Sequence, residues 1–271
     1  MRGVTRALHL ALLLAAAVVV LFPLYYSVAG SLMSDDQLTA FPAPLFPPGL
    51  ELENFSRVTK AFPLARQYAN SLLVSSAVVL GVLVTSVLSA YAFVFLRFPF
   101  RRLAFAAFIA TMMIPVESLI IPKYLLVAQL NWINTYPGLI VPFLATGFGT
   151  FLMRQFFAGF PVELYEAAKL DGCGHARFVT TILVPLSRHG IGVLAIYTFI
   201  ATYNQFFWPL LVTNTPQMQT LQIGLASLNH SEGRAPGLLF AGVVVAIAPM
   251  VVLFYLFQRN IVRGLTAGAV K

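Results

Sequence analysis

The sequence has few charged residues, and this scarcity excludes most classes of soluble protein. Only 10% of the 271 residues are Asp, Glu, Lys or Arg, whereas an average globular chain carries about 25%. Hydrophobic residues make up 59% of the chain, and the mean hydropathy is +0.85. A soluble domain of this length would expose far too much of that apolar surface to water. The composition therefore predicts an integral membrane protein.

The patterns of catalytic and metal sites are also missing from the sequence. Cys173 is the only cysteine, so no disulfide forms within the chain. The four histidines lack the spacing of a metal site, and we interpret each as an interfacial or loop residue: His9, His175, His189 and His230. No phosphate loop of the GxxxxGK type, ending in Ser or Thr, occurs. We therefore expect no enzymatic activity and no cofactor bound by this chain.

Long apolar runs dominate the sequence instead. A membrane-spanning helix needs ~20 consecutive apolar residues. Six windows meet or approach that length: Ala7–Ala29, Gln67–Leu96, Leu103–Ile121, Thr135–Met153, Gly190–Asn229 and Ala235–Gln258. Proline and glycine interrupt the third and fourth windows. We predict an all-α protein with six transmembrane helices.

The first window begins near two arginines, as a cleaved signal peptide does. Its uncharged length exceeds the usual ~7–15 residue signal core. Pro23 is followed by two tyrosines, which suit a membrane interface. We therefore predict a retained helix.

The basic residues indicate how the chain is oriented. With six helices and the N-terminus inside, the inner segments hold twelve of the seventeen Lys and Arg residues: Arg2, Arg6, Arg97, Arg101, Arg102, Arg154, Lys169, Arg177, Arg188, Arg259, Arg263 and Lys271. Positively charged segments are retained in the cytoplasm, so both termini are expected there. The net charge of +8 then reflects topology and implies no nucleic-acid partner.

A long outer loop follows the first predicted helix and separates it from the other five. Residues 1–66 hold the first helix and this loop, 67–258 hold the other five helices, and 259–271 form a C-terminal tail. The loop contains FPAPLFPPGL, whose four prolines favour an extended crossing. The following NFSRVTKAF is expected to form a short interfacial helix.

A compact charged segment, EAAKLDG at 166–172, lies between the fourth and fifth predicted helices. Pro161 suits the start of a helix, and two glutamates fall early, where carboxylates complement the positive helix end. The Asp-Gly pair is a turn signal, and Gly172 can take the positive φ that ends a helix. These features predict a short cytoplasmic surface helix over about 161–172.

Two interpretations of this helix remain open from its residues alone. It is either an ordinary connection that carries a surface helix or a docking element. In the second case, Ala167 and Ala168 are small enough for a partner surface to approach closely. A carboxylate on such a rigid mount can pair with an arginine of another protein.

EAAKLDG, followed by CGHARFVTTILVP, resembles the signature loop of permease subunits of bacterial ABC importers. Further stretches resemble the carbohydrate-uptake branch, with its maltose-type and glycerol-3-phosphate-type members: NSLLVS (70–75), SAYAFVFLRFPFRR (89–102), MMIP (112–115), NTYPGLIVP (134–142), FLMRQFF (151–157), YNQFFWPLL (203–211) and QRNIVRGLTAGAVK (258–271). The resemblance covers nearly the whole chain. The sequence departs from the branch at three positions. Members of the branch usually have Trp where this chain has Tyr203, usually have Ala where it has Cys173, and often have Gln where it has Glu117.

The resemblance implies a type I ABC importer permease, with a coupling helix seated in a cytoplasmic ATPase. Glu166 would pair with an ATPase arginine, Ala167 and Ala168 would form the close-packing face, and Asp171-Gly172 would fix the angle of the helix. The implied partners are a second homologous permease, an ATPase dimer that binds ATP and Mg, an extracytoplasmic solute-binding protein and membrane lipid. The implied location is the bacterial inner membrane. The tail GLTAGAVK resembles tails that reach toward the ATPase, and a loose end is the alternative.

Two groups of residues are candidates for the pathway or for a subunit interface. Glu117 is an acid well within a predicted helix, between two prolines; contact with water at the outer boundary is the alternative. TYNQFFWPL places Asn204 and Gln205 at mid-span beside Tyr203 and Trp208. Amides and aromatic rings suit sugar hydroxyls and ring faces, and amides suit hydrogen bonds between membrane helices equally well.

The residues favour a carbohydrate-like solute, with neutral sugars first and glycerol phosphates second. A phosphate calls for cations along its path, and Glu117 argues against one, whereas WPLLVT and LQIGLASL look closest to glycerol-3-phosphate-type members. An ion-driven secondary transporter of a small polar solute is the alternative, although it would show inverted repeats and several midplane acids. A membrane-embedded enzyme would need His, Asp or Ser clustered within the helices, and the sequence shows no such cluster.

Overall fold

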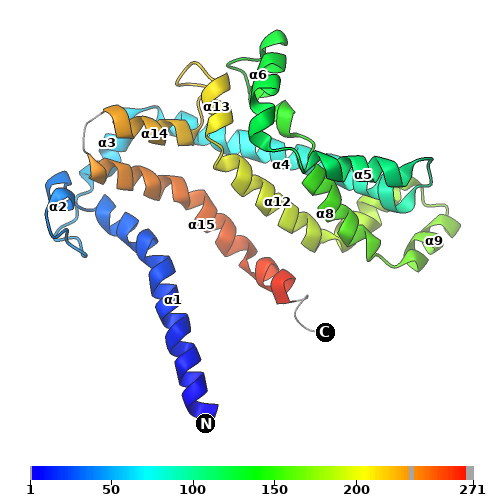
Figure 1. Cartoon of the computed structure of the whole chain (residues 1–271), viewed down its shortest axis with the longest axis horizontal. Helices are drawn as coiled ribbons and strands as arrows, with labels where there is room; N and C mark the ends of the chain where they lie inside the picture. The colour runs from blue at the N-terminus through cyan, green and yellow to red at the C-terminus, as the bar shows by residue number, and fades with distance from the viewer. Residues whose placement is uncertain (1, 232–234, 267–271) are drawn as a thin grey trace. The chain divides into compact units, whose positions relative to one another are not determined.

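All the regular secondary structure that is described for this chain is helical. The structure is a computed structural model, and it describes residues 2–231 and 235–266 (Figure 1). Three helices are long and continuous: α1 (Arg2–Ser31), α4 (Leu64–Phe95) and α15 (Pro236–Thr266). Each contains a segment long and apolar enough to cross a membrane. The prediction of an all-α membrane protein is confirmed.

Three further candidate spans are bent pairs of shorter helices. The first pair joins α5 (Arg101–Thr111) to η1 (Val116–Leu119) and α6 (Ile120–Gln129), with a bend of 95°. The second joins α7 (Tyr136–Ile140) and η2 (Val141–Phe143) to α8 (Gly147–Ala158), with a bend of 45°. The third joins α10 (His175–Arg177), η3 (Phe178–Leu183) and α11 (Val184–Leu186) to α12 (Arg188–Tyr203), with a bend of 81°. Pro115, Pro142 and Pro185 lie at or close to the three breaks, where the missing N–H interrupts the helical ladder. With each pair taken as one span, the described residues contain up to six.

The fifth predicted window, Gly190–Asn229, is not one helix. α12 ends at Tyr203, and α13 (Phe207–Val212) and α14 (Leu221–Ser231) follow. A continuous helix would press the ring of Pro209 against the carbonyl of Gln205, four residues earlier, and would lose a hydrogen bond there. The chain therefore breaks before α13, and the last part of the predicted window lies in α14.

Contacts within the chain group it into two units, Met1–Tyr68 with Leu221–Pro249 and Ala69–Thr220 with Met250–Lys271. In the first unit, α2 (Asp35–Thr39) and α3 (Glu53–Ala61) fasten the long loop. The Asp35 carboxylate pairs with Arg57 at 2.9 Å and accepts a hydrogen bond from the backbone of Gly237 at 2.9 Å. Residues 41–50, with their prolines, have no regular structure, whereas α3 confirms the predicted short helix.

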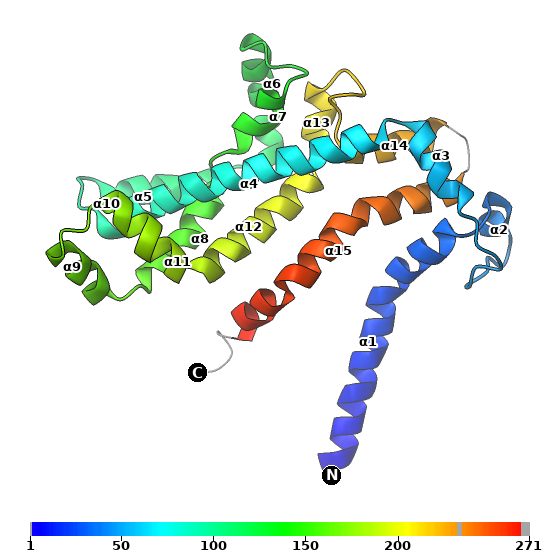
Figure 2. The same cartoon turned by 180° about the vertical axis from the view of Figure 1, so that it is seen from behind.

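In the second unit, α8 packs against both α5 and α12, and α13 packs against α6 and α7 (Figure 2). The core includes valines on one face of α4 and large side chains from the other helices: Val74, Val78, Val82, Leu139, Met153, Phe157 and Leu194. This core positions the short helix α9 (Val162–Leu170), which lies between α8 and α10.

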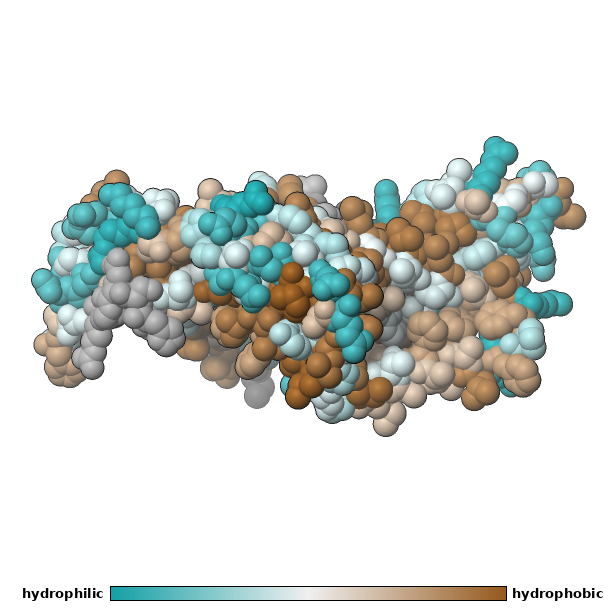
Figure 3. All heavy atoms as spheres, turned by 90° about the horizontal axis from the view of Figure 1, so that it is seen from above, coloured by the Kyte–Doolittle hydropathy of each residue, from teal (hydrophilic) through white to brown (hydrophobic). Residues whose placement is uncertain are grey.

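Hydrophobic residues are exposed over much of the face shown in Figure 3. On α1, Leu14 and Val19 are 65% and 72% exposed, and Leu80 of α4 is 65% exposed. Water disfavours so much apolar surface, whereas the hydrocarbon core of a bilayer accommodates it. At the C-terminus, α15 continues to Thr266, so the predicted tail begins as helix, and residues 267–271 lie outside the described residues.

Candidate functional site

The helix predicted over about 161–172 is α9, which spans Val162–Leu170. Pro161 precedes it as an extended cap residue, Glu163 lies in the first turn and Lys169 in the last. Acid near the N-terminus and base near the C-terminus both complement the helix dipole, each by about 0.3–1 kcal/mol. The local sequence therefore favours this helix independently of packing.

Hydrogen bonds close the C-terminal end of α9. Asp171 is the C-cap, and Gly172 follows with a φ of 71°. The Gly172 N–H donates to the Lys169 carbonyl at 3.0 Å, and the Cys173 N–H donates to the Ala168 carbonyl at 2.9 Å. These two bonds make a Schellman motif, in which the left-handed residue is usually glycine. The predicted role of Gly172 in ending the helix is confirmed.

The inner side of α9 rests on aromatic rings. The centroid of the Tyr165 ring lies 4.9 Å from that of Phe95, at the end of α4, and 5.0 Å from that of Phe178 in η3. Phe160 approaches Phe95 and Phe178 at 6.0 and 5.9 Å. Such pairs stabilise by about 0.5–1.5 kcal/mol each beyond the area they bury. α9 is thereby fixed to the end of α4.

His175, which was expected to be an ordinary interfacial or loop residue, also secures this region. The Tyr91 hydroxyl, from α4, forms a hydrogen bond with Nδ1 of His175, at the start of α10. The bond joins residues 84 positions apart, so no local spacing could have indicated it. His175 therefore holds the segment after α9 against the same helix that supports Tyr165.

The outer side of α9 carries the predicted docking residues, with one change. Glu166, Ala167 and Asp171 are exposed. Ala168 is only 7% exposed and belongs to the core of its own chain. Of the two alanines expected to form a close-packing face, only Ala167 is accessible to another protein. Residue spacing predicted the helix but did not predict which of its faces packs against the chain.

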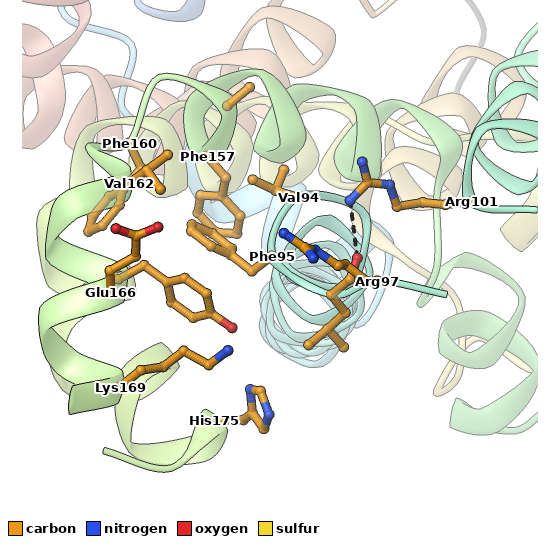
Figure 4. A pocket seen from close by; sticks show the side chains of 13 residues that line it. Val94, Phe95, Arg97, Arg101, Phe157, Phe160, Val162, Glu166, Lys169 and His175 are labelled. Atoms are coloured by element: carbon orange, nitrogen blue, oxygen red, sulfur yellow. Dashed lines mark hydrogen bonds between the residues drawn. The ribbon is translucent and has the colours of Figure 1, made fainter. Parts of the chain in front are cut away.

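A cavity of about 640 Å³ lies beside α9. Glu166 and Lys169 reach it from α9, and Arg97 and Arg101 reach it from the opposite wall, at the junction of α4 and α5 (Figure 4). Phe95, Phe157 and Phe160 are among the apolar residues that line it. Glu166 makes no ion pair within 4.0 Å in the part of the chain that the structure describes, so its carboxylate can receive a cationic side chain of another protein.

Glu117 lies in a break between helices. It belongs to the short turn η1 between α5 and α6, and it is exposed. The break follows Pro115, one of the two prolines that flank this acid, and a role of Glu117 in the pathway or at a subunit interface stays a prediction. The break places this carboxylate at a bend of 95°.

The segment TYNQFFWPL also differs from its predicted position. Tyr203 is buried at the end of α12, and Asn204 and Gln205 follow in the connection to α13, so neither amide lies at mid-helix. Trp208 is 3% exposed, and its Nε1 donates to the carbonyl of Gly138 at 3.0 Å. Tyr203 and Trp208 are thus core residues, whereas Asn204 is exposed.

The described residues contain no group of three or more His, Cys, Asp and Glu suited to a metal ion.

Asn134, the first residue of the NTYPGLIVP stretch, is a positioning residue that no local pattern singles out. Its backbone is left-handed, with a φ of 58°. Its Oδ1 accepts hydrogen bonds from the backbone N–H groups of Asn214 and Thr215, at 2.9 and 3.2 Å, and from the Thr215 hydroxyl at 3.1 Å. The bonds tie the turn before α7 to the loop after α13. Asn is favoured at a position that needs both a left-handed backbone and a local acceptor.

The described residues thus form continuous and bent apolar helices, with a capped helix connecting two of the bent pairs. A solved structure, the crystal structure of a bacterial ABC transporter involved in the import of the acidic polysaccharide alginate, has this fold with a TM-score of 0.85. The match covers 95% of this chain and 96% of that chain at 22% sequence identity. The chain therefore shares its fold with a chain of that transporter.

The family follows from the sequence matches. The model of the family described as binding-protein-dependent transport system inner membrane component matches residues 77–267. The sn-glycerol-3-phosphate transport system permease protein UgpE of Rhizobium meliloti (strain 1021) is 39% identical over 266 residues, which cover 95% of this chain and 94% of that protein. UgpE of Yersinia pestis is 37% identical over 273 residues, with 97% and 96% covered. The chain belongs to this family and is a permease subunit of an ABC importer.

Proposed function

We propose that this chain is one of two permease subunits of an importer for sn-glycerol-3-phosphate or a closely related phosphate ester. Relatives named for that solute are 37–39% identical over nearly the full length of the chain, and this similarity is the observation that supports the solute. It reverses the order expected from the residues, in which neutral sugars came first. The likeness to the alginate transporter, at 22% identity, concerns the fold and does not bear on the solute.

The other components follow from the family as proposals. A second homologous permease supplies the other half of the pathway, and an extracytoplasmic binding protein delivers the solute. A cytoplasmic ATPase dimer binds ATP and Mg and supplies the energy. This chain lies in the bacterial inner membrane with both termini in the cytoplasm, the side that holds most of its basic residues.

In this proposal α9 is the coupling helix that receives the motion of the ATPase. The Schellman motif closes one end, and rings from α4 and η3 support its inner side, so the helix does not move independently of α4. Glu166 and Ala167 lie on its exposed side. The carboxylate of Glu166 pairs with an ATPase arginine, a charge-assisted contact about twice as strong as a neutral hydrogen bond. Ala167 allows close approach.

A phosphate ester requires positive groups along its path. Lys123 of α6, in one of the bent spans, is a cation that could serve this purpose. Its Nζ lies 5.0 Å from the centroid of the Phe143 ring, and Phe143 in turn packs edge-on against Trp208 at 5.8 Å. This aromatic backing holds Lys123 as a fixed contact for a passing phosphate.

Solute uptake tests the proposal directly. Cells that lack this chain and are complemented with it should accumulate radiolabelled sn-glycerol-3-phosphate, and a tenfold excess of maltose should not compete. Uptake should cease when the ATPase gene is deleted. Competition by maltose but not by glycerol phosphate would contradict the solute, and uptake without the ATPase would favour an ion-driven transporter.

The role of Glu166 has its own test. The substitution Glu166→Lys should abolish uptake and release the ATPase on purification, while the chain stays inserted in the membrane. Glu163→Lys on the same helix is the matched control, because it makes the same charge change one turn away, and it should retain most uptake. Equal losses in the two variants would assign the effect to general charge and remove the specific pairing.

A further inference from the structure

The connection between α4 and α5 collects basic and aromatic side chains in one place. Arg97, Phe98, Phe100, Arg101 and Arg102 line a cavity of about 480 Å³; we call these five residues the arginine loop. Arg97 and Arg101 also line the larger cavity beside α9, where Figure 4 shows them across from Glu166 and Lys169. Two cavities therefore meet at the same two guanidinium groups.

The three arginines carry no acidic partner among the side chains that the structure describes. The ion pair that the described side chains do form, between Arg57 and Asp35, lies in the first unit and not in the unit that holds the arginine loop. Arg101 is held in place by a hydrogen bond from its Nη1 to the carbonyl of Leu96 at 3.1 Å, which leaves the charge unneutralised. Three like charges within six residues repel one another, so an anion placed between them lowers the energy of the loop.

The two phenylalanine rings of the loop are accessible, Phe98 less than Phe100 because it also packs against Phe93, with the ring centroids 6.0 Å apart. Phe100 is 79% exposed and Phe98 is 39% exposed. Phe100 has a φ of 59°, in the left-handed region of the backbone that residues other than glycine and asparagine rarely adopt. Backbone strain of this kind persists where the surroundings hold it and is concentrated at binding sites. The loop thus presents large apolar rings beside unneutralised guanidinium groups.

We propose that the arginine loop binds the headgroup of an anionic phospholipid. Guanidinium groups bind phosphate through paired hydrogen bonds, and exposed phenylalanine rings insert at the boundary between headgroups and acyl chains. The loop directly follows α4, a candidate membrane span of 32 residues, so it lies where a span ends. A soluble phosphate would use the arginines but not the rings, and an acidic protein segment would leave the rings in water.

Binding of defined lipids to the full-length chain, purified in detergent with the partners that accompany it, tests the proposal. Native mass spectrometry gives the affinity for short-chain phosphatidylglycerol, short-chain phosphatidylcholine and inorganic phosphate. Arg97→Gln/Arg101→Gln should weaken phosphatidylglycerol binding about 25-fold, since each basic residue near an anionic surface contributes about fivefold. Arg177→Gln/Arg188→Gln, which removes two exposed arginines elsewhere in the same unit, should change it less than twofold.

Two further variants separate the sources of the effect. Arg97→Lys/Arg101→Lys keeps the charge, so it should reduce binding less than fivefold and exclude simple misfolding. Phe98→Ser/Phe100→Ser should weaken phosphatidylglycerol binding at least threefold without altering binding of inorganic phosphate.

Three results would overturn the proposal. One is equal weakening by the two arginine-to-glutamine pairs, which would mean that any positive charge suffices. Another is displacement of the lipid by inorganic phosphate at the same concentration, which would identify a soluble ligand. The third is loss of the ATPase from the Arg97→Gln/Arg101→Gln variant with unchanged lipid binding, which would make the loop a protein-docking surface.

Discussion

The rings of Tyr165 and Phe95 lie with their centroids 4.9 Å apart, so the middle of α9 is joined to the end of α4. If α9 is the coupling helix, as proposed, its displacement by another protein would be transmitted to α4, the longest of the described helices. The contact also connects the proposed coupling helix to the arginine loop, which begins two residues after Phe95. A change in the position of α9 would alter the cavity between them.

Tyr165→Ala removes this contact. We expect it to lower the free energy of unfolding by about 1–3 kcal/mol, less than the ~3–5 kcal/mol for a fully buried ring, because Tyr165 is half-buried. Hydrogen exchange should rise across α9, and uptake should fall. Tyr165→Phe keeps the ring and should keep both the protection and the uptake. Unchanged exchange in the alanine variant would show that α9 is held by other contacts.

Gly172→Ala tests the cap of α9. An added Cβ would meet no atom within 4 Å, but the backbone φ of 71° is unfavourable for alanine. We expect the helix end to lose about 1–2 kcal/mol, seen as faster exchange of the amides of residues 171–173.

Gly192→Ala is the matched control for this change. It also adds a Cβ with nothing within 4 Å, but it lies inside α12, where alanine is favoured over glycine by about 0.5–1 kcal/mol. The two variants should therefore shift stability in opposite directions. A shift of the same sign would mean that the left-handed conformation of Gly172 is not maintained.

Asn134→Ala removes a side chain that accepts three hydrogen bonds. The Asn214 N–H is exposed and can bond to water instead, so we expect a loss of about 1–2 kcal/mol in stability by thermal unfolding. Asn131 has the same left-handed backbone, with a φ of 57°, but its side chain is exposed. Asn131→Ala should therefore cost about 1 kcal/mol or less. Equal costs would reduce the role of Asn134 to its backbone.

Trp208→Phe keeps an aromatic ring but removes the donor to the Gly138 carbonyl. Because the site is buried, the unpaired carbonyl should cost about 1–3 kcal/mol. Trp132→Phe changes a half-buried indole and should cost less than half as much. If the two substitutions cost the same, the hydrogen bond of Trp208 contributes little, and packing against Phe143 accounts for its burial.

Local patterns predicted the elements of this protein better than the contacts between them. Pro161, the early glutamates and Asp171-Gly172 lie within twelve residues, and together they located α9 and its end correctly. The rotation of α9 on α4, which buries Ala168 and exposes Ala167, depends on rings contributed by α4 and η3. The bond between Tyr91 and His175 likewise joins distant positions, and a single sequence carries no sign of it.

The sequence indicated only some of the breaks in the helices. Proline and glycine marked the interrupted third and fourth windows, but the uncharged run from Gly190 to Asn229 concealed the end of α12 at Tyr203. Pro209 was the available signal, because its ring excludes a helix that continues through Gln205. Hydropathy alone does not distinguish a straight span from two short helices that share the same apolar composition.

The bent pairs also bear on how the chain enters the bilayer during its synthesis. α5 has 11 residues and α6 has 10, and at 1.5 Å per residue each covers ~15 Å of a hydrocarbon layer ~30 Å thick. Neither half is long enough to be released laterally from the translocon by itself. Residues 101–129 are therefore expected to partition into lipid together, as one segment.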